Sequence, residues 1–140
     1  MKTLVVFRSI LGTSRQYAEW LAQRLECELI PFGQVKDRQL EAVDKVIVVS
    51  GTYAGWMPLV GFLKKHWQSL RDKKVVVVAV GLAPPDDEWS IRSYNKIPQE
   101  IRQHIEYFKL PGKVFEESPD LPSINKSRLE PVVKAVKKDD

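Results

Sequence analysis

Short apolar runs alternate with amphipathic segments along the 140-residue chain. The first, third and fourth runs are rich in β-branched residues and show little alternation of apolar and polar positions, which is typical of parallel strands covered on both faces. A proline in the second run favours an edge position, because proline donates no hydrogen bond to a neighbouring strand. The predicted strands span residues 2–8, 28–32, 45–50, 75–80 and 104–110.

Between these runs, apolar residues recur at the three- and four-residue spacing of amphipathic helices. Residues 34–41 are polar and predict a loop with a short helical turn, and Pro98 predicts a break in the third helix. The alternation of strands and helices predicts an α/β fold with a doubly wound parallel sheet and right-handed crossovers. The predicted helices span residues 13–26, 57–70, 90–101 and, from 123 or 125, to 137.

The length and composition indicate one folded domain over residues 1–140. With 44% hydrophobic and 29% charged residues, disorder is not expected. No apolar run approaches the roughly 18 residues that a membrane span needs, and no signal peptide is recognisable at the N-terminus, so a cytoplasmic location is expected. The single cysteine, Cys27, excludes an internal disulfide or a multi-cysteine metal site, and we expect it at the start of a buried strand.

The formal net charge of +4 favours acidic partners, anionic ligands or peripheral contact with an anionic membrane surface. Binding to nucleic acid is not expected, because the basic residues form no motif with interleaved aromatic residues. No set of residues has the spacing of metal ligands, and no metal site is predicted.

Residues 9–14 join the first predicted strand to the first predicted helix. Ser9, Thr13 and Ser14 offer hydroxyl groups around Gly12. Backbone N–H groups and the positive end of a helix dipole favour an anion at such a junction, and a phosphate is the expected guest. The alternative is an ordinary strand-to-helix turn, which also needs small residues and an N-cap.

Other phosphate and nucleotide sites do not match this loop. It lacks the Gly-x-Gly-x-x-Gly of dinucleotide-binding proteins, and Gly12 is not followed by the Lys-Ser/Thr of a P-loop. A receiver domain would need acidic residues at the strand ends, where this chain has Ser9 and Ser50. A low-molecular-weight phosphatase would need a cysteine in the first loop, and Cys27 lies elsewhere.

The spacing Ser9-x-x-Gly12-x-Ser14 resembles the phosphate-binding loop of flavodoxins, usually Ser/Thr-x-Thr-Gly-x-Thr, with Leu11 in place of a threonine. Residues 49–56 resemble the loop after the third strand in the protoporphyrinogen-oxidase-like branch of flavodoxin-domain proteins. Together with the strand at residues 75–80 and the glycine after it, the likeness extends to about Gly112.

The resemblance implies a flavodoxin-like three-layer sandwich with a five-stranded parallel sheet of order 2-1-3-4-5 and a bound FMN. In that order the loops after the first and third strands open onto one crevice, at the point where the winding reverses. The implied phosphate contacts are the hydroxyls and backbone of Ser9, Ile10, Leu11, Gly12, Thr13 and Ser14. Thr52 is implied to contact the phosphate or the ribityl chain, and the implied contacts to the isoalloxazine ring are Tyr53, Ala54, Gly55, Trp56, Gly81 and Trp89.

Flavin would supply the redox chemistry, and the protein would hold and orient it. The resemblance therefore implies an electron-transfer protein with a redox partner protein, or a small FMN-dependent oxidoreductase acting on a quinone or a tetrapyrrole precursor. No general acid or base is recognisable, so the catalytic residues are unassigned. The alternative is a flavodoxin-fold binding or scaffold protein that has lost FMN, which Leu11 and the basic charge motivate.

Overall fold

The structure is a computed structural model, and it describes residues 2–9, 12–53, 55–112 and 126–138. Within these ranges, five strands pair in parallel to form one sheet in the order β2-β1-β3-β4-β5. This confirms the predicted order, including the edge position of the second strand. The strands are β1 (Thr3–Arg8), β2 (Glu28–Pro31), β3 (Lys45–Gly51), β4 (Lys74–Gly81) and β5 (Glu106–Pro111).

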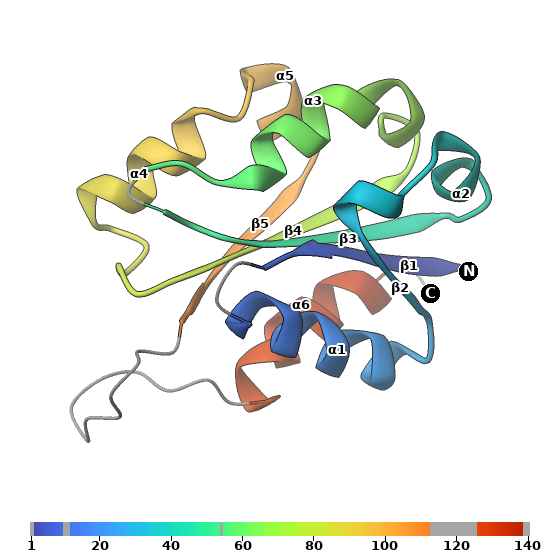
Figure 1. Cartoon of the computed structure of the whole chain (residues 1–140), viewed down its shortest axis with the longest axis horizontal. Coiled ribbons are helices and arrows are strands. Elements are labelled where there is room, and N and C mark those ends of the chain that lie inside the picture. Colours follow the sequence, from blue (N-terminus) through green and yellow to red (C-terminus); the bar gives the residue numbers. More distant parts are fainter. Residues whose placement is uncertain (1, 10–11, 54, 113–125, 139–140) are drawn as a thin grey trace.

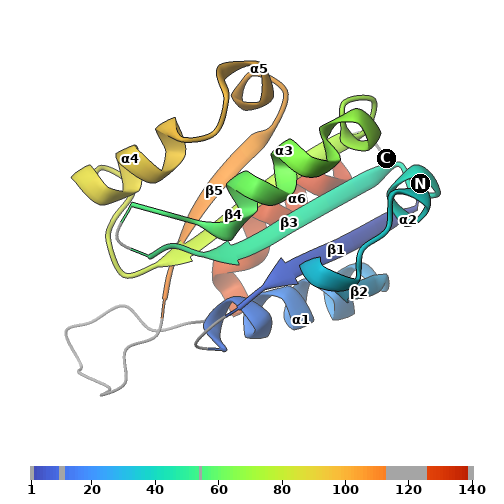
Figure 2. The same ribbon diagram turned by 45° about the horizontal axis from the view of Figure 1, so that its top comes forward.

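Helices cover both faces of the sheet, as a three-layer sandwich requires (Figure 1). One face carries α1 and α6, and the other carries α2 to α5 (Figures 1 and 2). The helices are α1 (Thr13–Leu25), α2 (Asp37–Glu41), α3 (Pro58–Leu70), α4 (Glu88–Asn95), α5 (Gln99–Arg102) and α6 (Glu130–Lys137), with short 3-10 turns at Phe32–Gln34 and Lys126–Leu129. No helix among the described residues has both the length and the apolar character needed to cross a membrane.

The central strands divide their side chains between two hydrophobic cores. On β3, Val46 and Val48 belong to the core under α3, whereas Ile47 and Val49 belong to the core under α1 and α6. All four side chains are fully buried. Because both sets face a helical layer, the strand reads as a continuous apolar run in the sequence.

Local signals explain most element boundaries and one difference from the prediction. Pro58 begins α3, and Pro98 separates α4 from α5, as the sequence predicts. Helix α4 begins at Glu88, earlier than predicted, because the Asp87 carboxylate accepts a hydrogen bond of 2.9 Å from the Trp89 N–H as an N-cap. Predicted features at residues 113–125 lie outside the described part of the chain.

The prediction for Cys27 is wrong. Its side chain is only half-buried, and it precedes the edge strand β2, which is itself only partly buried. The physical reason is that an edge strand has a neighbour on one side only and receives less cover than the central strands. Burial raises the pKa of the Cys27 thiol, so the described environment does not favour a reactive thiolate.

A buried lysine ties α6 to the sheet. Lys45, at the start of β3, is 2% exposed, and its Nζ donates a hydrogen bond to the backbone carbonyl of Val136. That carbonyl lies near the C-terminus of α6, where the helix dipole favours a cation. The contact joins segments that are 91 residues apart in the sequence.

We expect Lys45→Met to lower the free energy of unfolding by about 1 to 3 kcal/mol, because a buried carbonyl loses its donor. The matched control is Lys64→Met on the exposed side of α3, which should change stability by less than about 0.5 kcal/mol. Urea denaturation followed by circular dichroism measures both values. Equal midpoints for the two variants would contradict this role of Lys45.

Candidate functional site

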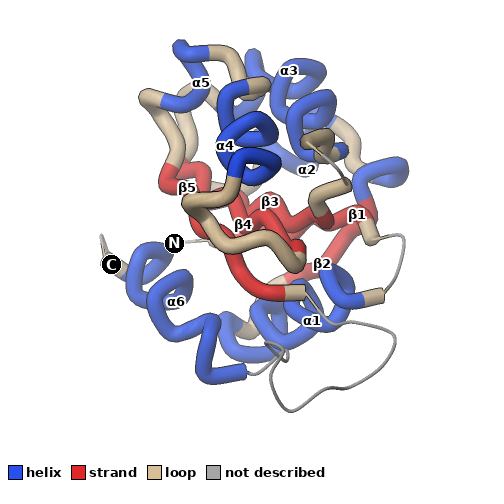
Figure 3. Tube along the Cα trace, turned by 90° about the vertical axis from the view of Figure 1, so that its left-hand side faces the viewer, coloured by secondary structure: helices blue, strands red, loops and turns tan. Residues whose placement is uncertain are grey.

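A cavity of about 360 Å³ opens at the carboxyl ends of the central strands. Figure 3 views the molecule from this side, where the loops that follow β3 and β4 lie in front of the sheet. Eight residues singled out from the sequence line the cavity: Ser9, Thr13, Ser14, Thr52, Tyr53, Gly55, Gly81 and Trp89. The structure thus brings together the loops that follow β1, β3 and β4.

The other residues singled out from the sequence are placed differently. Gly12 and Trp56 are not among the lining residues, and Trp56 has an exposed side chain. Ile10, Leu11 and Ala54 lie outside the described residues.

Sequence reasoning missed seven lining residues: Gly51, Val80, Leu82, Ala83, Ser90, Ser93 and Gly112. Ser90 and Ser93 follow Trp89 on α4, and Ser93 shares a helix face with Trp89 at the four-residue spacing. The four-residue spacing from Trp89 could have identified Ser93 from the sequence. No pattern in the sequence could have identified Gly112, because its position at the cavity depends on the pairing of β5 with β4.

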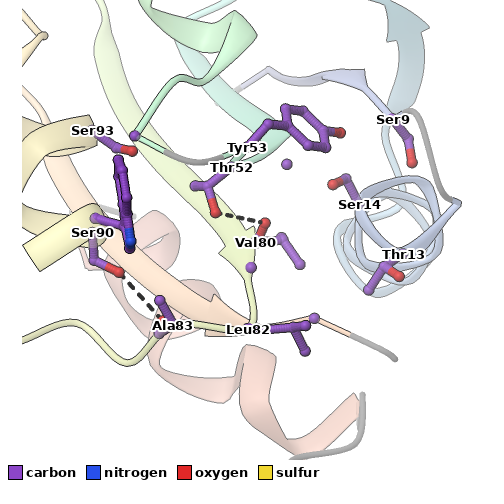
Figure 4. A pocket seen from close by; sticks show the side chains of 15 residues that line it. Ser9, Thr13, Ser14, Thr52, Tyr53, Val80, Leu82, Ala83, Ser90 and Ser93 are labelled. Carbon is purple, nitrogen blue, oxygen red and sulfur yellow. Dashed lines mark hydrogen bonds between the residues drawn. The ribbon is translucent and has the colours of Figure 1, made fainter. Parts of the chain in front are cut away.

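One end of the cavity is formed by the start of α1. The Ser9 hydroxyl accepts a hydrogen bond of 2.9 Å from the Gly12 N–H, and Gly12 takes a left-handed φ of 87° at the helix N-cap. No acidic residue lies in the first turn of α1, and among the described residues no side chain caps it. The buried Ser14 side chain faces the cavity (Figure 4). This end therefore offers hydroxyls and helix-start N–H groups to an anion.

A tight turn after β3 forms a second wall. The Tyr53 N–H donates to the Trp56 carbonyl at 2.7 Å, and the Trp56 N–H donates to the Tyr53 carbonyl at 3.1 Å. Gly55 provides a φ of 86° within the turn. The Tyr53 side chain extends toward Ser14 (Figure 4), and it passes so close to Gly51 that a Cβ there would collide with its hydroxyl.

Side chains from β5 and α4 hold the loop after β4 through hydrogen bonds to its carbonyl groups. Lys109 of β5 donates through Nζ to the Gly81 carbonyl at 3.2 Å and also to the Ala83 carbonyl. Ser90 of α4 donates to the same Ala83 carbonyl at 3.3 Å (Figure 4). Burial lowers the pKa of the Lys109 ammonium, and the nearby Asp87 carboxylate partly offsets this effect. These bonds position the backbone that forms the cavity floor.

Trp89 connects α4 to the turn after β3. A Cβ on Gly55 would lie 3.1 Å from Cε3 of the indole, so the ring packs directly against the glycine. The Arg92 guanidinium lies 5.1 Å from the centre of the indole ring and pairs with Glu88 at 2.8 Å. About half of the Trp89 side chain remains exposed, which leaves an aromatic surface at the cavity.

The lining has a polar end and an apolar, aromatic end. The hydroxyls of Ser9, Thr13 and Ser14 lie at the first (Figure 4). The second is formed by α4, which carries Trp89. Among the described lining residues, Tyr53 is the one titratable side chain, and the described residues contain no His, Cys, Asp and Glu cluster that could hold a metal. The cavity therefore suits an elongated ligand with an anionic group at one end and a flat ring at the other.

Comparison with known proteins bears on the family and the fold. A flavodoxin domain model matches residues 4–139. Similar solved structures include the flavodoxin of Streptococcus pneumonia TIGR4, at 19% identity and a TM-score of 0.64, with 100% of both chains covered. Oxidised Flavodoxin 2 from Bacillus cereus has 17% identity and a TM-score of 0.68, again with 100% of both chains covered.

A third solved structure, the Trp repressor binding protein from Bacillus subtilis, has 18% identity and a TM-score of 0.65. The match covers 99% of this chain and 100% of that one. At these identities the structural likeness establishes the fold alone. No curated protein sequence matches the chain significantly.

We expect Gly55→Ala to destabilise the protein by about 1 to 2 kcal/mol, because the added methyl group meets Trp89 and the backbone φ is positive. Gly61→Ala is the matched control. Gly61 lies within α3 with no atom near its Cβ position, so alanine there should stabilise by about 0.5 to 1 kcal/mol. Chemical denaturation measures both changes, and a neutral Gly55→Ala would contradict the close packing.

Proposed function

This chain belongs to the flavodoxin domain family, and we propose that it binds FMN non-covalently in the cavity at the ends of β1, β3 and β4 and transfers electrons. The observation that carries the proposal is the cavity itself, with hydroxyls and a helix start at one end and an exposed indole at the other. Its volume of about 360 Å³ lies within the usual range for cofactor sites. Bound FMN would supply the redox chemistry.

The polar end would hold the phosphate. Ser9, Thr13 and Ser14 would donate through their hydroxyls. The backbone N–H groups at the start of α1, together with those of residues 10 and 11, are proposed as further donors, whereas the Gly12 N–H already donates to the Ser9 hydroxyl. The absence of an acidic residue from the first turn of α1 supports this assignment, since a carboxylate there would repel the phosphate.

The apolar end would hold the ring. Tyr53 and Trp89 would pack against it, and Leu82 and the Gly81 backbone would complete the floor. The described lining residues would mainly bind and orient the flavin, with Tyr53 as the one titratable side chain among them.

Partners would approach at the cavity mouth, where Leu82 and Trp89 each expose about half of their side chains. We propose a redox partner protein, with a quinone-like small molecule or a tetrapyrrole precursor as the alternative acceptor. We also propose, from the sequence alone, that residues 1–140 form a single domain and that the protein is cytoplasmic.

The rival function is a flavodoxin-fold binding or scaffold protein without FMN. The observation that favours it is Tyr53, whose side chain reaches toward Ser14 across the space between the two ends of the cavity (Figure 4). Under our proposal this side chain turns aside or packs along the ligand when FMN enters.

We expect purified protein, incubated with excess FMN and desalted, to retain the visible absorbance of bound flavin. Ser14→Ala should weaken FMN binding by roughly tenfold, because a hydrogen bond to a charged phosphate is lost, and should leave riboflavin binding unchanged. Ser69→Ala on α3, away from the cavity, is the control. A colourless protein would overturn the proposal in favour of the scaffold function.

We expect FMN-loaded protein to reduce a quinone only slowly with a reduced nicotinamide alone, and faster when a partner reductase is added. The reason is that the described lining residues, once they hold FMN, would offer few further groups to bind a reduced nicotinamide beside the flavin. Steady-state turnover measures this difference. Rapid turnover without a reductase would instead assign the protein as an FMN-dependent oxidoreductase.

A further inference from the structure

Ser93 on α4 carries a buried hydroxyl without a hydrogen-bond partner among the described residues. The residue is 0% exposed, yet it borders the cavity. A serine inside a helix commonly donates to the carbonyl four residues earlier, and Ser93 does not do so. The hydroxyl has therefore lost its water without gaining a partner in the described part of the chain, which is unfavourable unless a ligand supplies one.

The neighbouring Ser90 behaves differently. It also borders the cavity, but its hydroxyl donates to the Ala83 carbonyl at 3.3 Å and holds the loop after β4. The two serines are three residues apart on one helix. Ser90 therefore has a structural hydrogen-bond partner, whereas Ser93 has none among the described residues.

Ser93 lies at the end of the cavity opposite to Ser9 and Ser14 (Figure 4). A flavin whose phosphate is held at the start of α1 would therefore place its ring near Ser93. That ring has one polar edge, the pyrimidine part with its N–H and carbonyl groups, and one apolar edge, the dimethylbenzene part. A buried hydroxyl pairs with the polar edge, since an apolar edge would leave it unsatisfied.

We propose that the Ser93 hydroxyl hydrogen-bonds the pyrimidine edge of the isoalloxazine ring and so fixes which edge of the flavin points into the protein. This inference rests on the proposed FMN binding. It leaves the dimethylbenzene edge toward the mouth, where Leu82 is exposed. Because the hydroxyl oxygen is closed to solvent, a change of the Ser93 rotamer or a small shift of the wall accompanies the contact.

The test is Ser93→Ala, with FMN and riboflavin titrated by fluorescence quenching. We expect both ligands to bind about three- to tenfold more weakly, because one hydrogen bond to the shared ring is lost. The visible bands of the bound flavin should shift relative to wild type. The ligand-free variant should melt at the same temperature as wild type or higher, because an unpartnered hydroxyl is removed.

Ser90→Ala is the matched control, and its ligand-free form should melt at a lower temperature because a partnered hydroxyl is removed. Equal flavin affinity of wild type and Ser93→Ala would overturn this inference alone. A lower melting temperature of ligand-free Ser93→Ala would also overturn it, by indicating a structural partner. Failure of the wild type to bind FMN or riboflavin would overturn the proposed function and this inference with it.

Discussion

The parallel pairing of β1, β3 and β4, with helices on both faces, is the constraint on which the rest of the structure depends. Side chains from these strands fill two cores at once, so neither face can be left without its helical layer. Parallel pairing also places the carboxyl ends of all three strands at one edge. The cavity lies at that edge because the loops that leave it must diverge to reach helices on opposite faces.

Long-range hydrogen bonds from two lysines hold other segments to this sheet. Lys45 ties the end of α6 to the start of β3, and Lys109 holds the loop after β4 from the neighbouring strand. Both lysines donate to backbone carbonyls of segments that are distant in the sequence, and the carbonyls that Lys109 contacts also accept from Gly112 and Ser90. The second contact bears on function, because the loop that it holds forms part of the cavity floor.

The cavity has a hydroxyl-rich end and an aromatic end, and under the proposed function a bound flavin would supply its redox chemistry. Its described walls supply hydrogen bonds and ring contacts but hardly any groups that transfer protons. Under our proposal the Ser93 side chain would add a polar group at the aromatic end and would distinguish the two edges of a flat ring. The orientation of that ring would then depend on α4 as well as on the loops.

The sequence by itself determined the element order, because local periodicity and turn residues mark each strand and helix. The resemblance of its loops to those of flavodoxins implied the strand order and the positions at the cavity of Ser9, Thr13, Ser14, Tyr53 and Trp89. Tertiary structure alone decided the half-buried position of Cys27, the burial of Lys45 and the lack of a hydrogen-bond partner for the Ser93 hydroxyl within the described ranges. The physical reason is that burial and hydrogen-bond satisfaction depend on which distant segments pack together. That outcome has no local signature in the chain.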